Sequence, residues 1–101
     1  MLNKLFKHKH AWLFKDPVDP EALGIPDYFK VVKNPMDFST IKSKLQGNKY
    51  LRIEDFIEDV NLTFDNCFLY NGENTQVGIM CKNVKEEYQR LYQQLYIDFY
   101  L

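Results

Sequence analysis

The distribution of proline limits what this chain can fold into more than any other feature. All four prolines lie between positions 17 and 35, at Pro17, Pro20, Pro26 and Pro35. A proline inside an α-helix costs about 3 kcal/mol or more, because it lacks an N–H donor and its ring clashes with the preceding turn. The segment is therefore predicted to be one long loop. Long ordered loops in compact domains are uncommon and often functional, so this loop is the first candidate region for a site.

Apolar residues at helical spacing lie on both sides of this loop. They predict four helices: residues 2–13, a short helix from the Asp37 N-cap to Gly47, a helix from Ile53 to about Asn71-Gly72, and a last helix that begins after Asn74 or Thr75. The sequence contains no alternating strand pattern and no repeat. It therefore predicts an all-α bundle of four helices, with one long connection and two short ones.

Composition narrows the possible functions. A length of 101 residues suffices for one domain, and the net charge of −1 disfavours a dedicated nucleic-acid binder, so we expect no direct nucleic-acid contact. No apolar run approaches the ~20 residues that a membrane span needs, so no membrane partner is expected. The apolar pattern continues to the last residues. We therefore expect a single domain over residues 1–101 that is part of a longer protein.

The cysteines and histidines do not predict a metal or catalytic site. Cys67 and Cys81 lack a CxxC spacing and lie in amphipathic stretches, so we expect them to be reduced, buried and apolar in character. His8 and His10 flank Lys9 in a basic segment, where they are expected to be solvated. The sequence predicts no metal, no cofactor and no catalytic residue.

Five short motifs occur in a fixed order along the chain. They are Trp12-Leu13-Phe14, Pro17-Val18-Asp19, Ile25-Pro26-Asp27-Tyr28-Phe29, Asn34-Pro35-Met36-Asp37 and Asn66-Cys67-Phe68-Leu69-Tyr70-Asn71. Each motif alone is ordinary. Their order and spacing over nearly the whole chain resemble the bromodomain family. The sequence departs from that family at Leu13, which stands where the shelf motif usually has proline and which puts the ligand selectivity of the shelf in doubt.

The resemblance implies a fold, a pocket and a function. The fold is a left-handed four-helix bundle whose long loop between the first two helices and short loop between the last two enclose a pocket for acetyl-lysine. By resemblance, Asn71 hydrogen-bonds the acetyl carbonyl and Tyr28 reaches the same oxygen through a water. The other implied pocket residues are the loop wall Val18, Leu23 and Ile25, the shelf Trp12, Leu13 and Phe14 with Phe14 as the floor, the second ring Tyr70, and Val77 at the gatekeeper position. The implied role is binding of acetylated histone tails or other acetylated proteins by a monomeric nuclear domain that catalyses no reaction, in chromatin and transcription regulation.

These residue types suit the ligand on physical grounds. Acetylation replaces the lysine charge with a neutral amide, for which an asparagine NH₂ is a donor without charge. The methyl group and the stem need apolar walls. An unmodified lysine would bring an ammonium into a pocket in which the sequence predicts no carboxylate partner. Burying an unpaired charge costs several kcal/mol, against about 1 kcal/mol gained by one neutral hydrogen bond. Selectivity is therefore expected to come mainly from rejection of the charged side chain.

Two other classes of function remain open at this point. One is a helical protein–protein interaction module whose pocket does not bind acetyl-lysine. The other is an enzyme, although the sequence has no HExxH motif, no phosphate-binding glycine loop and no evident Cys–His or Ser–His pair. Single residues also have a structural alternative: Asn71 before Gly72 fits a helix cap, and Val77 fits a core position.

Overall fold

The computed structural model describes the backbone of residues 2–100 and the side chains of residues 3–95. This part of the chain is helical and contains no strand. The helices are α1 (Leu2–Phe6), the 3-10 turn η1 (Ala11–Leu13), α2 (Pro20–Leu23), α3 (Tyr28–Val31), α4 (Phe38–Gln46), α5 (Ile53–Asn71) and α6 (Gln76–Tyr100). The predicted all-α class is thereby confirmed.

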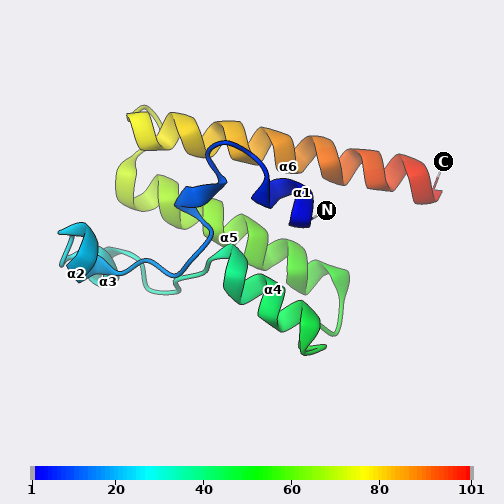
Figure 1. Ribbon diagram of the computed structural model, residues 1–101, viewed down its shortest axis with the longest axis horizontal. Coiled ribbons are helices and arrows are strands. Elements are labelled where there is room, and N and C mark those ends of the chain that lie inside the picture. The colour runs from blue at the N-terminus through cyan, green and yellow to red at the C-terminus, as the bar shows by residue number, and fades with distance from the viewer. Residues whose placement is uncertain (1, 101) are drawn as a thin grey trace.

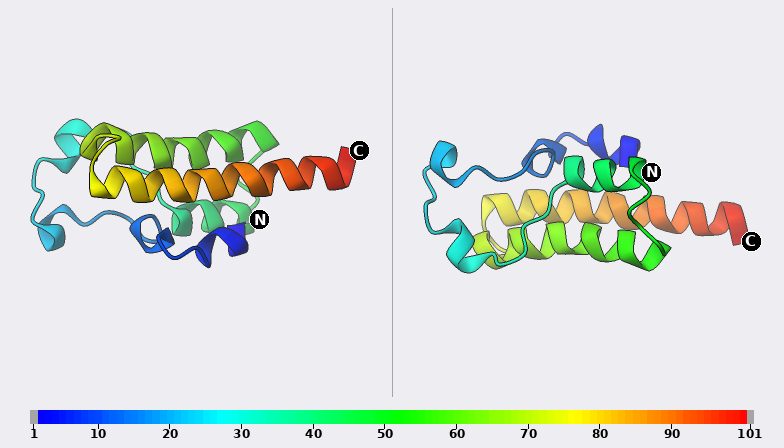
Figure 2. Two further views of the ribbon diagram at one scale, coloured as in Figure 1. Left: turned by 90° about the horizontal axis from the view of Figure 1, so that it is seen from above. Right: turned by 90° about the horizontal axis from the view of Figure 1, so that it is seen from below.

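Two long helices form the body of the molecule (Figure 1). α5 and α6 lie side by side along its long axis, α4 packs against α5, and α1 packs against both α4 and α6. The segment with α2 and α3 lies at the same end as the turn between α5 and α6 in all views (Figure 2). No helix within residues 2–100 is both long and apolar enough to cross a membrane.

The predicted helix over residues 2–13 is wrong, because the chain bends after α1. α1 ends at Phe6, and the Nδ1 atom of His8 then accepts a hydrogen bond from the backbone N–H of His10 at 3.1 Å. Leu5 and Ala11 are both buried. A spacing of six residues would put them on different faces of one helix, so a continuous helix could not bury both. The bend instead leaves Trp12 65% exposed.

The proline-rich segment was predicted to be one long loop, but it contains the short helices α2 and α3. Pro20 is the first residue of α2, where its missing N–H would have no partner in any case. The Asp19 carboxylate caps this helix, accepting from the N–H groups of Glu21 and Ala22 at 3.2 and 3.3 Å. Gly24, with φ of 70°, ends it. Proline is therefore disfavoured in the interior of a helix but tolerated in its first turn.

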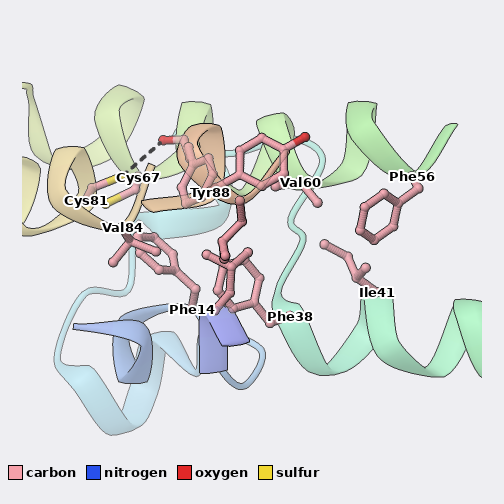
Figure 3. Close-up of a cluster of buried hydrophobic side chains, with 12 residues drawn as sticks. Phe14, Phe38, Ile41, Phe56, Val60, Cys67, Cys81, Val84 and Tyr88 are labelled. Atoms are coloured by element: carbon pink, nitrogen blue, oxygen red, sulfur yellow. Dashed lines mark hydrogen bonds between the residues drawn. The ribbon is translucent and has the colours of Figure 1, made fainter. Parts of the chain in front are cut away.

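The core lies between α4, α5 and α6 and is rich in aromatic rings (Figure 3). Phe64 is fully buried and its ring centroid lies 5.5 Å from that of Phe14, 6.1 Å from that of Phe38 and 5.9 Å from that of Tyr88. As predicted, Asp37 caps α4, accepting from the N–H of Thr40 at 3.0 Å. The side chains of Leu2 and Phe99, which fall in the first and last predicted helices, lie outside the described residues.

Candidate functional site

A cavity of about 320 Å³ opens at the end of the bundle where the α2–α3 segment meets the α5–α6 turn. All the residues predicted for the site line it: Trp12, Leu13, Phe14, Val18, Leu23, Ile25, Tyr28, Tyr70, Asn71 and Val77. The fold thus brings four separate stretches of the sequence to one hollow. Most of the lining side chains are apolar, as a pocket for a small neutral group requires.

Asn71 is the last residue of α5 and its side chain is held by the preceding turn. Its Nδ2 atom donates to the backbone oxygen of Cys67 at 3.0 Å and lies 3.7 Å from the Cys67 Sγ atom. The helix is capped by Gly72, with φ of 85°, and not by Asn71. An amide nitrogen carries two N–H groups, and its hydrogen bond to the sulfur is long and weak, so a ligand oxygen in the cavity can compete for that N–H.

Two tyrosine rings stand beside Asn71. The ring centroids of Tyr28 and Tyr70 are 5.1 Å apart, and the Tyr70 hydroxyl donates to the Asp27 carboxylate at 2.7 Å. This hydrogen bond raises the pKa of Tyr70 and links α5 to the residue before α3. Burial, with a smaller effect of nearby Cys67, raises the pKa of Tyr28. Both hydroxyls are therefore protonated at neutral pH, and that of Tyr28 has no hydrogen-bond partner among the described residues.

The floor and shelf of the cavity are fixed to α4. The buried Phe14 ring lies 5.6 Å from Phe38, and the Phe38 N–H donates to the Phe14 carbonyl at 2.7 Å. The next residue pair repeats this contact, since the Ser39 N–H donates to the Lys15 carbonyl at 3.0 Å. Leu13 packs against the core from the same segment. A side chain other than proline is therefore accommodated at this position.

The wall formed by the loop is less buried than the helical one. Val18 and Ile25 are half-buried, whereas Leu23 on α2 is 64% exposed. Across the cavity, Val77 is half-buried on the first turns of α6 and packs against the core. Val77 is thus both a core residue and a cavity residue.

The cavity also contains residues that the sequence argument missed. They are Asp16, Pro17, Met36, Asp37, Thr63 and Cys67. Helical spacing could have indicated two of them, because Thr63 and Cys67 precede Asn71 by two turns and one turn on the same face of α5. Pro17 and Met36 belong to the quoted motifs, but nothing in those motifs marked their side chains as facing the cavity.

Two carboxylates line the cavity, whereas the sequence argument predicted none that would pair an ammonium there. Asp37 is buried at the cavity, but its oxygens accept from the Ser39 hydroxyl and from the N–H and hydroxyl of Thr40, the last at 2.6 Å. Asp16 is exposed at the same cavity. The buried acid is therefore already satisfied by its own helix, and the other is open to solvent. Within residues 2–100, no group of three His, Cys, Asp or Glu side chains is placed to hold a metal ion.

The sequence profile of the bromodomain family matches residues 1–83. The chain belongs to the bromodomain family. Among relatives, the SWR1 complex bromodomain subunit bdf1 of Schizosaccharomyces pombe is 46% identical over 95 residues, which are 94% of this chain and 16% of that protein. Transcription factor GTE4 of Arabidopsis thaliana is 39% identical over 99 residues, which are 98% of this bromodomain and 13% of that protein.

A third relative is named for further domains besides the bromodomain. The ankyrin repeat, bromo and BTB domain-containing protein of Dictyostelium discoideum is 44% identical over 94 residues, which are 93% of this chain and 12% of that protein. The bromodomain therefore spans 16% or less of the length of each of these relatives. The similarity concerns this module and not the rest of those proteins.

Proposed function

We propose that the cavity binds acetylated lysine and that this bromodomain reads acetylated histone tails or other acetylated proteins. The observation that carries the proposal is the position of Asn71, a neutral donor at the end of an apolar cavity whose amide is held by one strong bond to a carbonyl and one weak bond to sulfur. Its first N–H is held by the Cys67 carbonyl, so the amide is oriented before a ligand arrives. A fixed donor loses little entropy on binding.

The remaining roles follow from the same geometry. The neutral Tyr28 hydroxyl supports a second hydrogen bond to the acetyl oxygen through a water. Phe14, Val18 and Ile25 surround the methyl group and the lysine stem with apolar surface. Leu23 and Trp12 are exposed enough to contact residues that flank the modified lysine.

Discrimination against unmodified lysine rests on the state of the two acids. The Asp37 carboxylate is occupied by its own helix, so an ammonium in the cavity would be buried without a free partner. Such burial costs several kcal/mol. Asp16 lies in water at the same cavity and would attract the ammonium only weakly. The neutral acetyl amide avoids the cost of burying charge.

A role in chromatin and transcription regulation, and a nuclear location, are part of the proposal. They are supported by the names of two relatives, a subunit of the SWR1 complex and a transcription factor. The proposed activity is binding by a monomeric domain without catalysis and without a cofactor.

Substitution of Asn71 by alanine tests the proposal. We expect calorimetric titration to give a micromolar or weaker dissociation constant for a singly acetylated peptide, on a scale where 1 μM is about −8 kcal/mol. Asn71→Ala should weaken binding by about 1–3 kcal/mol, because the acetyl oxygen loses its donor. Asn83→Ala, which changes an exposed asparagine on α6, is the matched control and should bind normally.

Two comparisons complete the experiment. The unmodified twin of the peptide should show no measurable binding. Urea unfolding of each variant verifies that it is folded. Equal binding of the two peptides, or unchanged affinity in a folded Asn71→Ala variant, would assign the domain to protein interactions that do not use acetyl-lysine.

A further inference from the structure

The two cysteines face each other between α5 and α6, directly behind the cavity. Cys67 is 8% exposed and lines the cavity, whereas Cys81 is fully buried one layer deeper. Figure 3 shows both sulfur atoms side by side in the same gap between the helices. The fold therefore places a reachable thiol next to a protected one.

The helices approach closely at this point. The Cys81 Sγ atom of α6 donates to the backbone carbonyl of Phe64 on α5 at 3.8 Å, so the side chain reaches the main chain of the facing helix. One turn earlier, Gly78 sits so tightly that a Cβ atom there would lie 2.1 Å from the Gly72 carbonyl oxygen. Disulfides need Cα atoms about 4.4–6.8 Å apart, which only closely packed helices provide.

We propose that Cys67 and Cys81 form a dithiol oxidation site, at which a hydroperoxide that enters the cavity converts the two thiols to a disulfide joining α5 to α6 and weakening ligand binding at Asn71. Hydrogen bonding with Cys81 lowers the pKa of Cys67, and the Asn71 amide acts in the same direction. Contact with Cys67, together with burial, raises the pKa of Cys81. Cys67 is thus the thiol that reacts first, since the thiolate is the nucleophile.

The reaction balances in two steps. The Cys67 thiolate attacks one oxygen of the hydroperoxide, an S–O bond forms, the O–O bond breaks, and an alcohol or water leaves after taking up a proton. The sulfur of Cys81 then attacks the Cys67 sulfenic acid, the S–S bond forms, and hydroxide leaves with the Cys81 proton as water. The two sulfurs lose two electrons, and the peroxide bond gains them.

The coupling to the ligand passes through Asn71 and assumes the proposed function. Asn71 is held by the Cys67 carbonyl at 3.0 Å and touches its sulfur at 3.7 Å. Formation of the disulfide commits the Cys67 sulfur to Cys81. This breaks its contact with the Asn71 amide and draws the last turn of α5 toward α6. Gly72 follows Asn71 and is already pressed against Gly78, so the turn has no room to absorb this shift. We expect about fivefold to tenfold weaker binding of an acetylated peptide, the factor that one neutral hydrogen bond contributes.

Mass spectrometry of the intact chain tests the oxidation. The reduced 101-residue chain is treated with hydrogen peroxide, and the remaining thiols are blocked with N-ethylmaleimide. The wild-type chain should lose the mass of two hydrogen atoms and take up no maleimide, and dithiothreitol should reverse both changes. Cys81→Ser should instead give a sulfenic acid at Cys67 that dimedone traps, whereas Cys67→Ser should leave Cys81 unmodified because it is buried.

Calorimetry on the oxidised and reduced chain tests the coupling. Dithiothreitol restores thiols but not methionine sulfoxides, so only a loss of affinity that it reverses counts for the disulfide. A sulfenic acid without cross-link in the wild type, or a disulfide between two chains, overturns the proposed site. An intramolecular disulfide with unchanged peptide affinity overturns the coupling. Failure of the reduced chain to bind acetylated peptide contradicts the proposed function, and the mass measurement still decides on the thiols.

Discussion

The two walls of the cavity are held in different ways. The helical wall consists of Thr63, Cys67 and Asn71. It belongs to α5, which also contributes buried side chains to the hydrophobic core. The loop wall around Leu23 belongs to α2, whose hydrogen bonds within the described residues are all local, from the Asp19 cap to Ile25. Position on a packed helix fixes the polar anchor, and we expect the loop wall, which is held by local contacts, to be the more adaptable side of the cavity. The experiments below test this difference, from the largest expected effect to the smallest.

The largest effect on stability is expected at Phe64, whose ring supports both the helical wall and the floor of the cavity. Phe64→Ala removes a fully buried ring that packs on Phe14 and Phe38, and it should lower the free energy of unfolding by about 3–5 kcal/mol. Urea denaturation followed by circular dichroism measures this loss. Phe29→Ala, at a half-exposed ring on α3, is the matched control and should cost much less. Similar losses in the two variants would show that the aromatic core does not support the helical wall.

An intermediate effect is expected where the end of the loop is tied to the helical wall. The buried Asn66 side chain donates from its Nδ2 atom to the Asn34 carbonyl at 2.8 Å. Asn66→Ala leaves that carbonyl without its donor and should lower the free energy of unfolding by about 1–3 kcal/mol. The exposed Asn83→Ala change again serves as control. Hydrogen exchange should also become faster in residues 32–36 than in α6, and uniform exchange would contradict a local tie.

A smaller effect is expected for the loop wall itself. Leu23→Ala should change the free energy of unfolding by about 0.5 kcal/mol or less, because the side chain is largely exposed. The substitution should weaken binding of acetylated peptides by about 1 kcal/mol or less, since the ligand covers only part of the side chain. Leu51→Ala, at an exposed leucine in the turn between α4 and α5, should leave affinity unchanged. A loss as large as that of Asn71→Ala would mean that the loop wall, and not the anchor, dominates binding.

The smallest effect is expected from the acids around the cavity. Asp19 caps α2 and Asp27 accepts from Tyr70, whereas the carboxylates of Asp16, Glu21 and Glu73 have no such bond within the described residues. All of these acids are exposed. We expect acetylated peptides with Lys or Arg neighbours to bind about twofold to threefold better than peptides with neutral neighbours, and to lose this advantage as salt rises. Titrations at several salt concentrations measure it. If the two kinds of peptide bind equally at all salt concentrations, the acids around the cavity do not contribute to binding.

The sequence by itself determined the helical class and most of the boundaries. Asp37 begins α4, Gly47 follows its last residue, and α5 ends at Asn71 before Gly72, as their side chains and turn preferences predict. The family resemblance also pointed to ten residues that the structure places around one cavity, although their roles toward a ligand stay predictions. Caps, glycines and prolines act within a single turn, so these features can be recognised without knowledge of distant contacts.

The tertiary structure alone decided which side chains meet. It interrupted the first helix so that Leu5 and Ala11 could both reach the core. It also joined the Asn66 side chain to the Asn34 carbonyl and the Tyr70 hydroxyl to the Asp27 carboxylate. Burial and pairing of this kind depend on packing between segments far apart in the chain, where many arrangements satisfy the same local pattern. The predicted residues therefore indicated where a site lies, and only the packing determined which of its side chains meet.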